Sequence, residues 1–149
     1  VPTILPDGTE QLDAQGKMIV TPTPNADSGI LLRGDLKSQC NIWCWPIGSG
    51  EVYGYRRDKT LAPEVRAAVT PKLRADRPVG EWNRFIIRMA GDRLTVNLNG
   101  SIVIDNARLP GVPPKGPIGF QHHGGKEKDG SFNNASSLVQ FRNVFIRKL

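Results

Sequence analysis

The sequence predicts an all-β fold, an antiparallel β-sandwich, over residues 28–149. Short stretches with an apolar side chain at every second position recur there, and 16 Gly and 12 Pro residues favour many turns between short elements. Asn99-Gly100 is the commonest signal for a two-residue hairpin turn. A chain of 149 residues is long enough for one sizeable core. We therefore expect one sandwich domain at 28–149, preceded by an N-terminal arm or insertion at 1–27.

The first elements are bounded by residues that interrupt regular structure. Strands are expected in chain order at residues 17–21, 28–33, 39–45 and 51–55. Gly34 ends the second of these strands and Pro46 the third. Residues 61–68 are expected to form one helical turn, because Pro63 suits a first-turn position.

The second half of the chain carries the clearest alternation. Strands are expected at residues 82–89, 93–99, 101–105, 118–122 and 138–148, which brings the total to about nine. The first three of these strands follow one another through tight turns and form an antiparallel meander. Their inward side chains are Phe85, Ile87, Met89, Leu94, Val96 and Leu98. A β-bulge is expected near Asn143, because Phe141 and Val144 cannot share a face by strict alternation.

Charge and cysteine usage exclude several classes of function. The net charge is +6, but the Lys and Arg residues are scattered, so we expect no nucleic-acid partner. No apolar run reaches the roughly 18 residues of a membrane span. Cys40 and Cys44 lie about 13 Å apart on an extended strand, beyond the roughly 7 Å that a disulfide allows. We expect both thiols to be unpaired.

One face of the 39–45 strand carries polar and aromatic side chains. Gln39, Asn41, Trp43 and Trp45 alternate there, and Cys40, Ile42 and Cys44 form the opposite apolar face. Amides bind pairs of hydroxyl groups, and aromatic rings stack on the apolar face of a pyranose. Arg33, Gln121, Glu51, Tyr53 and Tyr55 extend this set. The pattern favours sugar recognition, and its alternatives are a solvated sheet face and, for the two indoles, burial beneath the N-terminal arm.

Candidates for acid–base chemistry are few. His122 and His123 are the only histidines. His123 suits proton transfer or the binding of a metal, and its alternative is a polar strand end that bonds to a loop. No pair of carboxylates for ordinary glycoside hydrolysis is evident, which argues against a retaining or inverting glycosidase.

Six motifs taken together resemble one known family. They are NADSGILLRG (25–34), GSGEVYGYR (48–56), GEWNRFII (80–87), LTVNLNG (94–100), GPIGFQHHG (116–124) and VQFRNVFIRKL (139–149). In this order they resemble the 3-keto-disaccharide hydrolase domain family. The resemblance implies a concanavalin A-like sandwich, or jelly roll, in a secreted or periplasmic bacterial protein. It also implies hydrolysis, or elimination and hydration, of 3-keto-glycosides, with a 3-keto disaccharide or oligosaccharide as the partner.

The implied chemistry explains why no carboxylate pair is needed. A 3-keto group acidifies the proton on C2, so one base and one stabiliser of the enolate suffice for elimination. By the resemblance, His123 is the expected base or a ligand of a divalent metal, and Glu51 is the second candidate for the base. The expected substrate-binding residues are Arg33, Gln39, Asn41, Trp43, Tyr53 and Gln121.

The resemblance also implies strands that precede the motif at 25–34. We expect a second chain or an N-terminal fragment to complete the sandwich, because an open sheet edge invites pairing. The competing function is a non-catalytic carbohydrate-binding or structural module in a larger assembly. A concave pocket that holds the candidate residues favours the enzyme, and a flat face favours the binding module.

Overall fold

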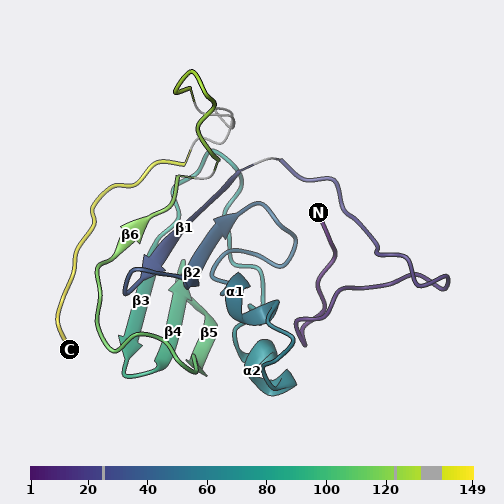
Figure 1. Cartoon of the computed structure of the whole chain (residues 1–149), viewed down its shortest axis with the longest axis horizontal. Helices are drawn as coiled ribbons and strands as arrows, with labels where there is room; N and C mark the ends of the chain where they lie inside the picture. Colours follow the sequence, from purple (N-terminus) through teal and green to yellow (C-terminus); the bar gives the residue numbers. More distant parts are fainter. Residues whose placement is uncertain (25, 123, 132–138) are drawn as a thin grey trace.

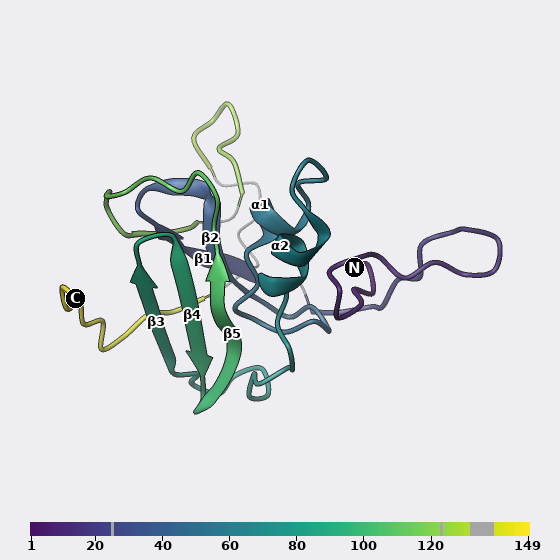
Figure 2. The same cartoon turned by 90° about the horizontal axis from the view of Figure 1, so that it is seen from below.

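The computed structural model describes residues 1–24, 26–122, 124–131 and 139–149. Two antiparallel sheets, with strand orders β2-β1-β6 and β3-β4-β5, form its body (Figure 1). Two short helices lie beside the sheets, and the N-terminal segment extends outward on the side of these helices (Figure 2). The predicted β-sandwich is therefore confirmed. No helix in the described part of the chain has the length and apolarity to cross a membrane.

The first sheet is built on one hairpin. β1 (Asp27–Leu32) pairs with β2 (Asp35–Trp43) through a turn at Arg33 and Gly34, both of which have positive φ. β6 (Gly119–Phe120) pairs with the other side of β1. The strands predicted at 28–33, 39–45 and 118–122 are thus present with shifted ends.

The second sheet is the predicted meander. It consists of β3 (Phe85–Ala90), β4 (Arg93–Leu98) and β5 (Ser101–Arg108). Asn99 (φ 53°) and Gly100 (φ 94°) both adopt the left-handed backbone that the predicted type I′ turn requires.

The core lies between the two sheets. Leu32 and Cys40 enter it from the first sheet, and the second sheet contributes most of the rest. The buried side chains of β4 and β5 are Leu94, Val96, Leu98, Val103, Ile104 and Ala107. Phe85, Ile87 and Met89 pack against this cluster, as the alternation predicted. Both cysteines are unpaired, as expected.

The two helices close one side of this core. α2 (Pro63–Ala68) confirms the helical turn predicted at 61–68. The strand predicted at 51–55 is wrong, because α1 (Tyr53–Arg56) occupies this stretch. The carbonyl of Val52 accepts from the backbone N–H groups of Tyr55 and Arg56, and Val52 and Tyr55 are both buried. Apolar residues three apart share a face of a helical turn, whereas on a strand they would point to opposite sides.

The N-terminal arm contains isolated β-bridges instead of the strand predicted at 17–21. Single residue pairs join Pro2 to Val20, Ile4 to Glu10 and Leu12 to Met18. Asp7 and Asp13 each accept hydrogen bonds from following backbone N–H groups, and these local turns keep the extended pieces short. The division of the chain at residues 27 and 28 stays a prediction.

The strand predicted at 138–148 is wrong over its described part, because residues 139–149 form no strand there. Asn143 has φ 52°, which interrupts an extended backbone, and no paired strand exists for the expected bulge. The six strands of the described residues therefore fall short of the nine expected.

Candidate functional site

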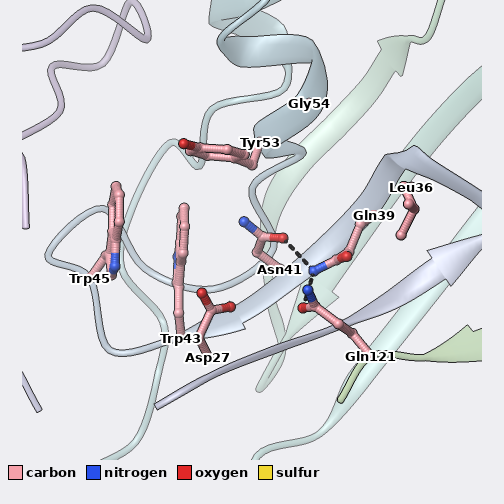
Figure 3. Close-up of a pocket in the computed structure, with 9 residues that line it drawn as sticks. All are labelled: Asp27, Leu36, Gln39, Asn41, Trp43, Trp45, Tyr53, Gly54 and Gln121. Carbon is pink, nitrogen blue, oxygen red and sulfur yellow. Dashed lines mark hydrogen bonds between the residues drawn. The ribbon is translucent and has the colours of Figure 1, made fainter. Parts of the chain in front are cut away.

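A pocket of about 250 Å³ opens on the face of β2 that points away from the core (Figure 3). Because Cys40 points into the core, strand alternation turns its neighbours to this opposite face. The lining residues are Asp27, Leu36, Gln39, Asn41, Trp43, Trp45, Tyr53, Gly54 and Gln121. Elements from three parts of the chain therefore meet at one site.

Three amides at the floor of the pocket are joined through Gln39. Its Nε2 donates to Oε1 of Gln121 at 2.7 Å and to Oδ1 of Asn41 at 3.0 Å. The Gln39 side chain crosses β1 directly over Gly29, where a Cβ would lie 2.3 Å from Nε2. Gln39 and Asn41 are buried, so this part of the face is not an open solvated surface.

The backbone holds Gln121 in place on the far side of β1. Its N–H donates to the carbonyl of Gly29 at 2.8 Å, and its carbonyl accepts from the hydroxyl of Ser28 at 2.7 Å. The pairing of β6 with β1 thus continues beyond the strand and brings Gln121 opposite Gln39.

Aromatic rings line the other end of the pocket. Trp43 and Trp45 stack with centroids 4.1 Å apart and an angle of 4° between their planes. Tyr53 meets Trp43 edge-on, with centroids 5.9 Å apart. A Cβ at Gly54 would lie 2.5 Å from the carbonyl oxygen of Lys37, so glycine lets α1 approach β2 closely enough to place Tyr53 here. In Figure 3, Trp43 lies between Trp45 and the amides.

Asp27 contributes a carboxylate that the sequence reasoning missed. It is the first residue of β1 and pairs in register with Trp43. The expected strand began at Ser28, which left Asp27 outside the pattern. A strand that begins one residue earlier places Asp27 on the same face as Gly29, and this was the signal that could have found it.

Glu51, the second candidate for the base, lies in the interior and does not line the pocket. Its carboxylate is fully buried and accepts a hydrogen bond from Nε of Arg56. Burial raises the pKa of Glu51 to about 7, although the Arg56 guanidinium acts in the opposite direction. Its Oε2 has no hydrogen-bond partner among the described residues. The Glu51 carboxyl therefore lies in the interior beside Arg56 of α1, while the backbone carbonyl of Glu51 accepts a hydrogen bond from the backbone N–H of Asn41.

Arg33 also lies away from the pocket. Its Nη1 donates to the carbonyl of Pro113 at 2.8 Å, in the loop that follows β5. The same loop approaches so closely that a Cβ at Gly116 would lie 2.1 Å from the Arg33 carbonyl oxygen. The hydrogen bond from Arg33 therefore holds this loop against the β1–β2 turn.

His123, the first candidate for the base, lies outside the described residues, so its predicted role stays a prediction. The residues that the structure does describe contain no group of three or more His, Cys, Asp or Glu side chains that could hold a metal ion. The divalent metal expected with His123 as its ligand stays a prediction.

The family model of the 3-keto-alpha-glucoside-1,2-lyase-like domain matches residues 10–147. The chain belongs to this family. Searches of curated proteins and of solved structures each returned no match. The match confirms the family expected from the motifs, and the family's name indicates carbohydrate as its class of ligand.

In this 3-keto-alpha-glucoside-1,2-lyase-like domain, one pocket gathers polar and aromatic side chains on the outer face of β2. It brings together most of the predicted substrate-binding residues, namely Gln39, Asn41, Trp43, Tyr53 and Gln121. It leaves out Arg33 and Glu51 and adds Asp27. Amides, aromatic rings and one carboxylate therefore share a face built by β1, β2, α1 and the end of β6.

Proposed function

We propose that this protein cleaves 3-keto-glycosides by elimination, followed by hydration, in the pocket on β2. Two findings support the proposal: membership of the 3-keto-alpha-glucoside-1,2-lyase-like family and the chemistry of the pocket. The main observation behind the proposal is that three amides, two stacked indoles and the Asp27 carboxylate line one pocket.

The pocket suits one sugar ring. Its volume of about 250 Å³ lies just below the roughly 300–1,000 Å³ of pockets that enclose drug-sized ligands. Trp45 and Tyr53 are partly exposed beside the buried Trp43, and their rings offer apolar surface to the C–H groups of a pyranose. The Nδ2 of Asn41 and the Nε2 of Gln121 donate to no acceptor within the described chain, so both N–H₂ groups are free for sugar oxygens.

Elimination needs one base and one stabiliser of negative charge. The base takes the proton from C2, and the electrons of that C–H bond form an enolate with the oxygen on C3. When the C3 carbonyl re-forms, a double bond forms between C1 and C2 and the bond from C1 to the leaving oxygen breaks. That oxygen takes up a proton and departs as an alcohol, and water then adds across the new double bond. Every step balances without a redox partner.

The pocket supplies both components. Asp27 is the carboxylate among the lining residues and takes the role of base in this proposal. The amide N–H₂ groups of Asn41 and Gln121 stabilise the enolate oxygen through hydrogen bonds. His123 is the alternative base, because it lies in the motif GPIGFQHHG that resembles the family.

The test measures turnover of the 3-keto derivative of a nitrophenyl glucoside by the wild-type protein and by the Asp27→Asn and His123→Ala variants. Loss of a general base lowers kcat by about 10²–10⁴-fold. We expect this loss for Asp27→Asn with little change in KM. An exposed control, Glu64→Gln, should retain full turnover. Normal turnover by both site variants contradicts the proposal.

The stacked indoles favour a second candidate function, a non-catalytic carbohydrate-binding module. Trp43 and Trp45 form a stacked aromatic pair, and the outer face of a stacked indole can hold a sugar without chemistry. Binding of the same glycoside by the wild-type protein, with no release of nitrophenol, supports this second function over the first.

A further inference from the structure

The proposed elimination needs an acid as well as a base, because the oxygen that leaves C1 takes up a proton. A proton delivered to this oxygen as its bond to C1 breaks speeds the departure of a poor leaving group. Among the lining residues that the structure describes, Tyr53 alone has a hydroxyl group. A phenol is more acidic than an alcohol, so it can give its proton to the leaving oxygen.

Arg57 binds the oxygen of the Tyr53 hydroxyl and leaves its proton available. Nη1 of Arg57 donates to this oxygen at 2.5 Å. A guanidinium group has donors and no acceptor, so the phenolic proton cannot be shared with Arg57. The described part of the chain provides no other acceptor for that proton. The positive charge beside the oxygen would also stabilise the phenolate that forms when the proton leaves.

The ring of Tyr53 is held from several sides. It meets Trp43 and Trp45 edge-on, with ring centroids 5.9 Å and 6.3 Å away. The guanidinium groups of Arg56 and Arg57 each lie 5.4 Å from the centroid of the Tyr53 ring. A catalytic group needs this kind of support, because packing fixes its rotamer and hence the position of its reactive atom.

Tyr53 and Asp27 approach the pocket from different ends of the Trp43 side chain. Asp27 pairs in register with Trp43 across the two strands, whereas the Tyr53 ring lies against the indole. Figure 3 shows Asp27 near the base of Trp43 and Tyr53 beyond the tip of its ring. A sugar ring bound beside this indole meets a base on one side and an acid on the other. The arrangement suits an elimination in which the C2 proton and the leaving group depart from opposite faces of the ring.

We propose that Tyr53 is the general acid of the elimination and that Arg57 positions its hydroxyl, an inference that rests on the function proposed above. The electron pair of the broken C1–O bond stays on the leaving oxygen, which takes the phenolic proton. Tyr53 then becomes a phenolate beside Arg57. During hydration this phenolate takes a proton from the water that attacks C1, and the proton held by Asp27 returns to C2. Both side chains thus regain their starting states.

The test follows release of the alcohol in a single turnover of two substrates, the 3-keto derivatives of nitrophenyl glucoside and of methyl glucoside. Nitrophenolate leaves without a proton, whereas methoxide needs the acid. In Tyr53→Phe we expect the rate to fall by about 10²–10⁴-fold for the methyl glycoside and to stay close to wild type for the nitrophenyl glycoside. Arg57→Gln should show a smaller loss of the same kind. Arg57→Lys should restore the rate, because it keeps a charged donor.

Tyr55→Phe is the matched control on the same helix. The hydroxyl of Tyr55 donates to the carbonyl of Pro110 at 3.1 Å, and Tyr55 does not line the pocket. This variant should release both alcohols at wild-type rates. Tyr53→Phe keeps the aromatic ring and its contacts with the indoles, so it should retain wild-type thermal unfolding.

The leaving group separates failure of this inference from failure of the proposed activity. Equal losses on the two glycosides in Tyr53→Phe, or a wild-type rate on the methyl glycoside, overturn the role of Tyr53 while the activity stands. A wild-type rate of Arg57→Gln on the methyl glycoside overturns the role of Arg57. If the wild-type protein releases neither alcohol, the proposed activity is wrong and this inference is wrong with it.

Discussion

Glu51→Gln tests whether burial controls the protonation of the core carboxyl. Glu51 is fully buried against Arg56, and burial raises its pKa from the usual 4.5 to about 7. Burial favours the neutral form, so between these two pH values the folded state keeps a proton that the unfolded chain has released. The free energy of unfolding therefore falls as the pH rises through this window.

The size of the effect follows from the two pKa values. The gap between 4.5 and about 7, at about 1.4 kcal/mol for each pH unit, amounts to about 3 kcal/mol. This contribution is fully present below pH 4.5 and is lost as the pH rises through about 7. The amide that replaces the carboxyl in Glu51→Gln does not titrate, so the variant lacks this loss. We expect the stability of the wild-type protein, measured relative to the variant, to fall by about 3 kcal/mol across the window.

The measurement is urea unfolding of both proteins at pH values on either side of the window. Comparison with the variant cancels the titration of the other carboxyl groups. Glu64→Gln on α2 is the control, because Glu64 is exposed. Parallel loss of stability in the wild type and in Glu51→Gln, or a steeper pH dependence in the variant, refutes the reasoning.

Three further predictions concern the core and the site. Leu94→Ala should destabilise the protein by about 2–5 kcal/mol, whereas truncation of the half-exposed Ile102 should cost much less; chemical denaturation checks both. Gly29→Ala should displace the side chain of Gln39 and raise KM while the fold persists, and unchanged KM contradicts the close crossing. Arg33→Ala removes the hydrogen bond to Pro113, so it should lower the free energy of unfolding by about 1 kcal/mol and leave KM unchanged. A raised KM would instead indicate that Arg33 contacts the substrate.

The sequence predicted the fold best where local pattern and turn chemistry agree. The alternation of β3 and β4 and the turn at Asn99-Gly100 depend on residues close in the chain, and the structure reproduces them. The strand predicted at residues 51–55 was wrong, because the same spacing of apolar residues also fits a helical turn. The helix forms because it lets Val52 and Tyr55, which are three residues apart, both point into the core.

The candidate site also combines features that neighbouring residues predict with features that depend on the tertiary fold. Alternation along β2 correctly placed Gln39, Asn41 and Trp43 on one face, and the structure added Gln121 from the far side of β1. Arg33 and Glu51 shared the expected polarity, but neither lines the pocket. Arg33 bonds to the carbonyl of Pro113, which is far away in the sequence, and Glu51 turns into the core beside Arg56 because residues 53–56 form a helix instead of the expected strand. Asp27 entered the pocket because the pairing with β2 begins one residue before the expected strand.

The sequence by itself determined the sandwich class, the family and the chemical character of the pocket face. The two-residue period of strands, the turn residues and the ordered motifs are properties of neighbouring residues, so they can be recognised without knowledge of the fold. Only the tertiary structure decided which polar groups meet. A hydrogen bond or an ion pair forms between atoms a few ångströms apart, as when Gln39 reaches Gln121 across Gly29, and that proximity arises only after the strands are assembled.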